Sequence, residues 1–213
     1  MRFVPIKSIE QQDILSIHRV RERLVKNRTA LANEIRGLLH EFGFIIPQGI
    51  NKVIAKLTEI LDNEGLSQMS WQTFNDLKEE FLDNDKKIKE LEKRLKIIAG
   101  ELDKYQQLTS IPGLGLITAT ALVATIGNAG CFENGRQLSA WLGLVTRQNS
   151  SGGKEKILGI SKRGDVYLRT LLIQGARAVL NAKLRFTTEE QKAKKEYSKF
   201  TDWMFNLAER REA

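Results

Sequence analysis

The feature that most constrains this chain is a run of apolar and aromatic residues spaced alternately three and four apart. The run consists of Phe74, Leu77, Phe81, Asn84, Ile88, Leu91, Leu95, Ile98, Leu102 and Tyr105, of which only Asn84 is polar. Because an α-helix repeats every 3.6 residues, this spacing places the whole run on one face and is typical of a coiled-coil seam. At ~1.5 Å per residue the segment forms a rod of roughly 48 Å. It predicts a long helix whose seam must be covered by a second helix.

The sequence leaves two partners open for this seam. One is a long helical stretch that begins at a capping box of Ser8 and Gln11 and runs to about Phe42. The apolar stripe of that stretch is Leu24, Leu31, Ile35, Leu38 and Phe42. The other partner is a second copy of the chain, which predicts a homo-oligomer. The proposed oligomer seam is Leu77, Phe81, Asn84, Ile88, Leu91, Leu95 and Ile98. Asn84 costs stability there but fixes register, because a slipped seam would bury its amide without a partner.

The charge of the chain is concentrated in one zone. The 213 residues contain 34 Lys and Arg against 26 Asp and Glu, a net charge of +8. Counted by zone, residues 1–45 carry +3, 46–106 carry −2, 107–186 carry +7 and 187–213 carry 0. A local field of this kind attracts polyanions such as nucleic acid. For the arginines of the first helix, a solvated face is the simpler interpretation and phosphate contact is the alternative.

Several classes of protein are disfavoured by composition. No apolar run approaches the ~20 residues of a membrane span, and the first residues lack the apolar core of a secretory signal. We therefore expect a cytoplasmic protein of bacterial type, associated with the nucleoid when bound to DNA. The single Cys131 and the two histidines, His18 and His40, provide neither a disulfide framework nor a zinc site.

A glycine motif opens the basic zone. Residues 111–127 read IPGLGLITATALVATIG, in which Gly113 and Gly115 precede a helix of small residues. This order is typical of a helix-hairpin-helix DNA module, because glycines let main-chain N–H groups at a helix N-terminus face a phosphate. Such contacts read the backbone and tolerate any base sequence. The alternative is an ordinary glycine turn between two helices.

A second glycine motif follows within residues 147–165, RQNSSGGKEKILGISKRGD. We expect a flexible loop whose cations hold a phosphate, with a serine hydroxyl that becomes a nucleophile once a base or metal activates it. The serines are Ser150 and Ser151, and the proposed phosphate-binding cations are Arg147, Lys154, Lys156, Lys162, Arg163 and, on the next helix, Arg169. Taken alone, Ser-Ser-Gly-Gly is also a linker composition.

The predicted fold is mainly α. Residues 1–106 form the long helix and the coiled-coil helix, and residues 107–186 form a compact helical domain with a helix-hairpin-helix-like motif and a short β-hairpin around 144–160. Residues 187–213 form a charged, truncated C-terminal helix. The carboxylates within 107–186, namely Glu133, Glu155 and Asp165, are too scattered to bind Mg²⁺, so we predict no metal site.

Three segments taken in order resemble a known family. IPGLGLITATALVATIG, CFENGRQLSAWLGL and SSGGKEKILGISKRGDVYLRTLLIQGA are similar to the C-terminal domain of the DEDD transposases of insertion-sequence family one-hundred-and-ten, in its eleven-eleven branch. The opening, FVPIKSIEQQDILSIHRVRERLVKNRTALANEIRGLLHEFG, resembles the helical region that follows the catalytic domain in these proteins. The resemblance implies an N-terminal RuvC-like domain with four acidic Mg²⁺ ligands, a coiled coil and a C-terminal domain that supplies a serine.

The resemblance also implies a function. Members act as recombinases guided by a structured bridge RNA, and their serine attacks a DNA phosphodiester. Carried over, the serine of the motif is Ser151, with Ser150 as the adjacent alternative. This chain begins after the expected acidic domain, so we expect it to bind DNA but not to cut it alone, with no cofactor of its own and Mg²⁺ only in the full-length enzyme. The alternative function is a non-catalytic nucleic-acid-binding and dimerisation module, a remnant or regulator of a full-length transposase.

Overall fold

The computed structural model describes residues 6–62, 65–102, 104–185 and 203, and the described chain is mainly α-helical as predicted. The chain divides into two compact units. Residues 13–98 form one, called here the helical-hairpin unit, and residues 1–12 with 99–213 form the other, called the C-terminal unit. The predicted C-terminal helix of residues 187–213 lies outside the described residues, apart from Trp203.

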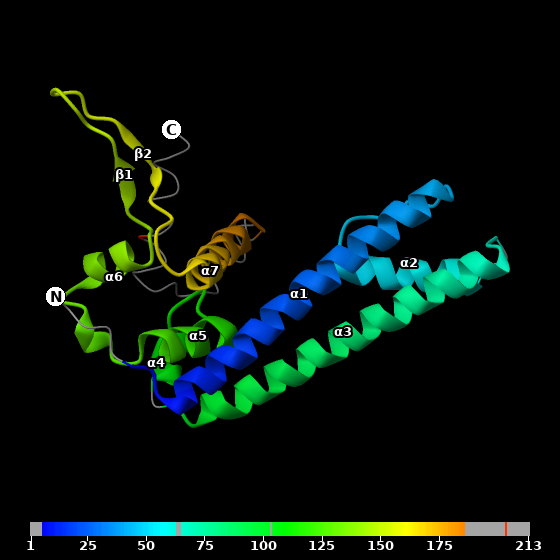
Figure 1. Ribbon diagram of the computed structural model, residues 1–213, viewed down its shortest axis with the longest axis horizontal. Coiled ribbons are helices and arrows are strands. Elements are labelled where there is room, and N and C mark those ends of the chain that lie inside the picture. The colour runs from blue at the N-terminus through cyan, green and yellow to red at the C-terminus, as the bar shows by residue number, and fades with distance from the viewer. Residues whose placement is uncertain (1–5, 63–64, 103, 186–202, 204–213) are drawn as a thin grey trace. The chain divides into compact units, whose positions relative to one another are not determined.

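Three helices build the helical-hairpin unit. They are α1 (Ile9–Glu41), α2 (Ile50–Asp62) and α3 (Gln68–Gly100), and Figure 1 shows α1 and α3 lying side by side. The predicted capping box starts α1, since the Ser8 amide donates to Gln11 Oε1 at 3.0 Å and the Gln11 amide donates to Ser8 Oγ at 3.2 Å. These two bonds satisfy donors that the first helical turn leaves without partners.

Two ion pairs fix α1 and α3 in an antiparallel register. Arg21 Nη2 lies 2.6 Å from Glu92 Oε1, and Arg28 pairs with Asp85. The partners advance by seven residues along α1 and retreat by seven along α3, so the helices run in opposite directions. The intramolecular hairpin is therefore the alternative that the structure adopts.

The seam of α3 is covered within the chain. Phe81, Asn84, Ile88 and Leu95 are buried, while Leu77, Leu91 and Ile98 are half-buried. The expected rod is shifted toward the N-terminus, because α3 begins at Gln68 and ends at Gly100. Leu102 and Tyr105 therefore do not belong to it.

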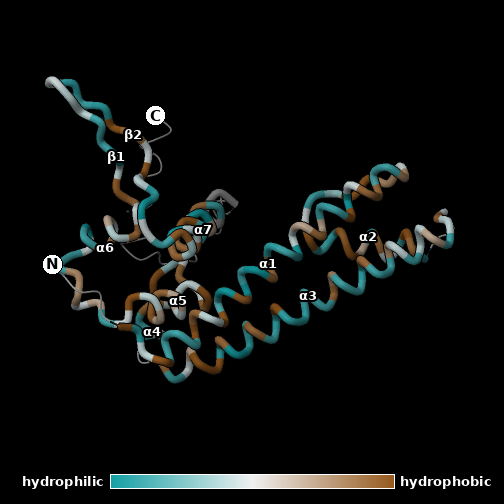
Figure 2. The backbone as a smooth tube through the Cα atoms, in the orientation of Figure 1, coloured by the Kyte–Doolittle hydropathy of each residue, from teal (hydrophilic) through white to brown (hydrophobic). Residues whose placement is uncertain are grey.

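A third helix covers one end of the hairpin. The amphipathic α2 packs Val53, Leu57, Ile60 and Leu61 against buried residues of α1 and α3. Trp71 fixes the approach of α3, since its indole N–H donates to the Leu61 carbonyl at 3.0 Å. Hydrophobic residues recur along all three helices in Figure 2, in keeping with a shared core.

The C-terminal unit is a set of shorter helices around a small core. Its elements are α4 (Tyr105–Thr109), α5 (Leu116–Ile126), the 3₁₀ turn η1 (Ala129–Cys131), α6 (Gly135–Trp141), β1 (Thr146–Gln148), β2 (Ile157–Ile160) and α7 (Val166–Arg185). Ala121, Leu122, Leu142 and Leu168 are the buried centre. The helix α6 is short, because Asn134 caps its start through the Gln137 amide, at 3.0 Å, and Gly143 turns the chain at φ 71°.

The expected β-hairpin is present as an antiparallel β1–β2 pair. Figure 1 shows it extending away from the helices of its unit, and in Figure 2 its end is white and teal, the colours of neutral and hydrophilic residues. None of the described helices is both long enough and apolar enough to cross a bilayer.

Candidate nucleic-acid interface

The end of the hairpin is a tight two-residue turn. Ser151 and Lys154 face each other and exchange both backbone hydrogen bonds, at 3.3 and 3.1 Å. Between them Gly152 and Gly153 adopt φ of 58° and 78°, the pattern of a type I′ turn. The glycines therefore form a tight turn where an open loop was expected, because a residue with a Cβ avoids positive φ at both central positions.

The turn distinguishes the two candidate serines. The Ser150 hydroxyl accepts the Lys156 amide at 3.3 Å. The Ser151 side chain is exposed and its hydroxyl has no hydrogen-bond partner among the described residues. Because Ser151 and Lys154 form a hydrogen-bonded cross-strand pair, their side chains lie on the same face of the hairpin. An ammonium group therefore accompanies the free hydroxyl.

Five of the six predicted cations are exposed on the hairpin or at its base. They are Arg147, Lys154, Lys156, Lys162 and Arg163, and within the described ranges none is paired with a carboxylate. In the helical-hairpin unit, by contrast, Arg21 and Arg28 are held by Glu92 and Asp85. Unpaired surface cations remain available to an external polyanion.

Arg169 differs from the other predicted cations. It is only 7% exposed, and its Nη1 donates to the Leu142 carbonyl at 3.0 Å. This contact joins the start of α7 to the chain just after α6. The structure thus gives Arg169 a role inside the fold, away from a phosphate. Asp165 beside it caps α7, since its Oδ1 accepts the Leu168 amide at 2.9 Å.

The two glycines of the first motif have different surroundings. Gly113 has φ 89°, and a Cβ there would lie 2.8 Å from the Gly175 carbonyl oxygen of α7. Its lack of a side chain is therefore required for packing. Gly115, the N-cap of α5, is exposed and has open space around it. Of the two, only Gly115 leaves room for a ligand to approach the first turn of α5.

The base of the hairpin is fixed by a close crossing of two glycine turns. A Cβ on Gly143 would lie 2.2 Å from the Arg163 carbonyl oxygen, and one on Gly164 would lie 2.1 Å from the Trp141 carbonyl oxygen. The Lys162 amide also donates to the Gly143 carbonyl at 3.0 Å. The hairpin therefore leaves the helices at a defined point.

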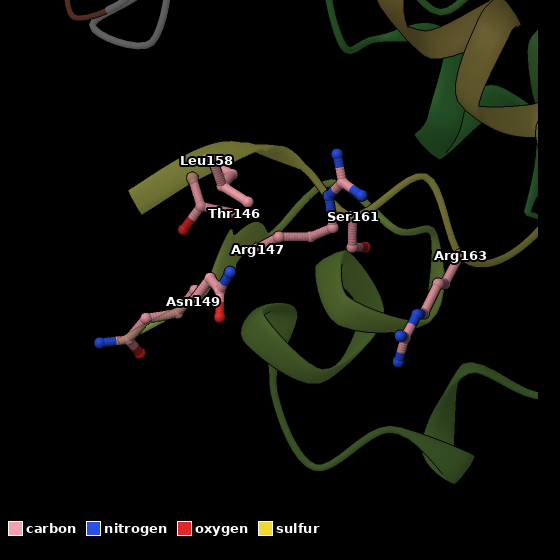
Figure 3. A pocket seen from close by; sticks show the side chains of 7 residues that line it. Thr146, Arg147, Asn149, Leu158, Ser161 and Arg163 are labelled. Atoms are coloured by element: carbon pink, nitrogen blue, oxygen red, sulfur yellow. The ribbon is translucent and has the colours of Figure 1, made fainter. Parts of the chain in front are cut away.

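A hollow lies beside an irregularity in the strand pairing. Thr146 pairs with Ile160 but Gln148 pairs with Ile157, so Leu158 and Gly159 together face Arg147. Such a bulge redirects neighbouring side chains. The hollow has a volume of about 370 Å³ and is lined by Thr146, Arg147, Gln148, Asn149, Leu158, Ser161 and Arg163 (Figure 3). Four of these polar residues, Thr146, Gln148, Asn149 and Ser161, were not predicted as site residues; Gly159 within a strand is the signal that could have indicated a bulge.

The carboxylates of this unit do not fit a magnesium site. Asp165 is committed to capping α7, and Glu155 lies exposed next to the hairpin turn. In the described part of the chain no group of three or more His, Cys, Asp or Glu residues could hold a metal ion. The residues present therefore lack the oxygen cluster that Mg²⁺ prefers.

Known proteins match both this unit and the chain as a whole. Residues 105–191, which contain α4 to α7 and the hairpin, match the model of the Transposase IS116/IS110/IS902 family. The chain is 45% identical, over 99% of its length, to the transposase for insertion sequence element IS1111A of Coxiella burnetii. It is 46% identical over 84% of its length to a probable family 20 transposase of Pseudomonas aeruginosa and 37% identical over 84% to the transposase for insertion sequence element IS1328 of Yersinia enterocolitica.

The matches cover only part of these relatives. The chain spans 56% of the Coxiella protein and 54% of each of the other two. The matched spans contain the β1–β2 hairpin and its base. The chain therefore belongs to the IS116/IS110/IS902 family of transposases.

Proposed function

We propose that this chain is the DNA-binding C-terminal part of a transposase that mobilises an insertion sequence, and that Ser151 is its nucleophile. The observation that carries the proposal is the hairpin turn, where an exposed hydroxyl without an internal partner lies on the same face as Lys154. The names of the relatives support the overall activity. The unpaired cations of the hairpin support binding to DNA through its phosphates.

The proposed step is a transesterification. Ser151 Oγ attacks the phosphorus of a DNA phosphodiester and forms an Oγ–P bond, while the bond from that phosphorus to one deoxyribose oxygen breaks. The serine proton passes to a base, and the departing sugar oxygen takes up a proton. Lys154 stabilises the additional negative charge on the phosphate oxygens in the transition state. Because one phosphate ester replaces another, the step needs no oxidant or reductant, and its reversal rejoins DNA.

Within the described residues the serine has no activating group. A neutral serine hydroxyl is a weak nucleophile. Within the described residues no histidine or carboxylate bonds to the Ser151 hydroxyl, and no acidic cluster fits Mg²⁺. We therefore propose that the acidic domain implied by the family resemblance supplies the base and the metal, and that this chain alone binds DNA without cutting it.

The same observation favours the second candidate function. A chain with a cationic hairpin and an unactivated serine acts as a non-catalytic nucleic-acid-binding module, a remnant or regulator of a full-length transposase.

A structured guide RNA is a further proposed partner on the basis of the resemblance. The homo-oligomer also stays a prediction: Phe81, Ile88 and Leu95 are already buried within the single chain, so a second copy would bind another face. The mass of the chain in solution tests it.

Reconstitution with the acidic domain tests the nucleophile. The chain is mixed with a separately expressed acidic domain from a longer relative, Mg²⁺ and DNA carrying that relative's insertion-sequence ends. A covalent protein–DNA species is sought on a denaturing gel. It is expected with the native chain, absent with Ser151→Ala and retained with the matched control Ser150→Ala. An adduct that survives Ser151→Ala contradicts the assignment, whereas DNA binding itself should be the same in all three chains.

A further inference from the structure

The hollow beside the β1–β2 bulge combines two guanidinium groups with neutral polar groups. Arg147 and Arg163 both line it, together with the Ser161 hydroxyl and the Asn149 amide. Figure 3 shows Arg147 extending toward Ser161, with Arg163 beyond it. In the described structure no carboxylate neutralises either arginine. Two like charges that share one hollow are best accommodated by an anion between them, and planar guanidinium groups match phosphate oxygens.

Two residues that line the hollow, Arg147 and Asn149, lie on the face of the hairpin that carries Ser151, whereas Thr146 and Gln148 lie on the other face. Side chains alternate along a strand, so Arg147, Asn149 and Ser151 share one face. Backbone pairing places Lys154 opposite Ser151 and Lys156 opposite Asn149. Near the base, the Ser161 amide donates to the Val145 carbonyl at 2.8 Å, so Ser161 is opposite Val145, two residues before Arg147 on its face.

The bulge produces this alignment. Strict alternation from Lys154 along the second strand would put residues 156, 158 and 160 on the Ser151 face and residue 161 on the opposite face. Because Leu158 and Gly159 together face Arg147, the alternation shifts by one and Ser161 joins the face of Leu158. A single face therefore carries cations and polar groups from the hollow to the turn.

The separation along this face matches a short length of nucleic acid. Ser151 lies four positions after Arg147 along the strand, which is a distance of about 13 Å at ~3.3 Å per strand residue. One strand of stacked DNA rises ~3.4 Å per nucleotide, so the same span corresponds to about four nucleotides. A strand held at the hollow would therefore reach Ser151 within a few phosphates.

We infer that the hollow binds one backbone phosphate of the DNA strand that the hairpin presents to Ser151, and so sets which phosphodiester meets the serine. The ligand class is a phosphodiester, held by Arg147 and Arg163, with Ser161 and Asn149 as neutral hydrogen-bonding partners. The inference rests on the proposed function, because it assumes that the strand at the hairpin is DNA. The hollow would be a second point of contact with the strand, and it adds Ser161 and Asn149 to the predicted site residues.

The salt dependence of binding tests the single-phosphate site. The full chain is titrated with a fluorescent 20-nucleotide oligo-dT at several salt concentrations, for the native protein, Arg147→Gln, Arg163→Gln and the double variant. Each phosphate contact on a single strand contributes ~0.7 to the slope of log K against log salt. Because both arginines hold one phosphate, each variant should lower the slope by about 0.7 and the double variant by no more than that.

A matched control removes the same charge elsewhere in the unit. Arg136 on α6 and Arg177 on α7 are exposed and do not line the hollow. The Arg136→Gln/Arg177→Gln protein should retain the native slope. Circular dichroism spectra and melting curves confirm that all variants fold, so that a lost slope reports on binding.

The outcomes separate this inference from the function it rests on. A native slope of zero would contradict DNA binding itself. A steep native slope that is unchanged in the Arg147 and Arg163 variants would contradict a phosphate site in the hollow but leave DNA binding in place. Additive losses, about 1.4 in the double variant, would mean two separate phosphates and overturn the single site. An arginine-dependent slope with oligo-rU but not with oligo-dT would identify the strand as RNA and contradict the inference.

Oligonucleotide length tests the path from the hollow to the turn. Oligo-dT of three nucleotides fills the hollow but falls short of the turn, whereas eight nucleotides reach it. Lys154→Gln should therefore weaken binding of the longer oligonucleotide several-fold and leave the shorter one unchanged, while Arg147→Gln weakens both. Equal effects of Lys154→Gln on both lengths would show that the short strand does not occupy the hollow, and would overturn the inference.

Discussion

His18 shows how one buried residue links the helical hairpin to pH. It lies on α1 and its exposed fraction is only 1%. Burial, and secondarily the positive charge of Arg21, lower the pKa of His18 from 6.5 to about 4. The folded state therefore holds the neutral imidazole.

This pKa predicts a pH-dependent stability. Between pH 6.5 and 4 the unfolded chain binds a proton at position 18 that the folded chain does not, so stability falls as the pH falls through this window. Above 6.5 both states are neutral and the effect is absent. The whole window amounts to on the order of 3 kcal/mol. His18→Gln should remove this part of the dependence, as measured by urea unfolding from pH 4 to 7.5.

The exposed His40 provides the control for His18. Because His40 is exposed on the same helix, His40→Gln controls for the effect of the substitution itself. The pKa of Asp85 is lowered, first by a hydrogen bond with Lys89, from an ordinary value of 3.8. The contribution of Asp85 to stability is therefore lost only as the pH falls below 3.8. Its titration therefore lies below the His18 window. An unchanged slope in His18→Gln would show that the imidazole is hydrated in the folded state.

At the scale of elements, the contact of α7 with the turn before α5 depends on two glycines. A Cβ on Gly175 would lie 2.2 Å from the Gly113 carbonyl oxygen, a distance that real Cβ atoms do not adopt. Both groups in this contact are main-chain atoms, so relief requires the two elements to separate. Such separation would disturb the small core that contains Leu168 and Leu122.

Alanine substitutions at two helical glycines should therefore act in opposite directions. Gly175→Ala should destabilise the chain by about 1–3 kcal/mol, since overpacking outweighs the gain in helix propensity. Gly37 lies within α1 and has open space where a Cβ would project, so Gly37→Ala should stabilise by about 1 kcal/mol. Thermal unfolding of both variants measures this contrast. Stabilisation by both substitutions would mean that the α5–α7 contact adapts at little cost.

The elements also show what the sequence could predict. The long helices were predictable because their apolar periodicity and the Ser8–Gln11 capping box are local signals. The glycines signal the two-residue turn, but glycine-rich composition alone does not distinguish a tight turn from a flexible loop. The burial of Arg169 could not be read from its neighbours in sequence, since it depends on the Leu142 carbonyl 27 residues earlier. The hollow likewise depends on strand register, which a one-residue shift at Gly159 changes.

At the scale of the whole molecule, the two units divide charge unequally. The helical-hairpin unit, residues 13–98, contains 15 basic and 14 acidic residues, so nearly all of the net +8 belongs to the rest of the chain. Several basic groups of the helical-hairpin unit also form ion pairs within it, among them Arg21, Arg28 and Lys89. From charge and pairing together we expect polyanion binding at the C-terminal unit.

A fragment of residues 13–98 tests this division. It retains the core shared by α1, α2 and α3, so it should fold by itself, with a helical circular dichroism spectrum and cooperative melting. Its near-balanced charge predicts a slope of log K against log salt close to zero on duplex DNA, whereas the full chain should lose affinity steeply between 50 and 200 mM salt. If the folded fragment bound with the slope of the full chain, the phosphate contacts would belong to the exposed arginines of α1. The interpretation of these arginines as a solvated face would then be wrong, and the β1–β2 hairpin would need another role.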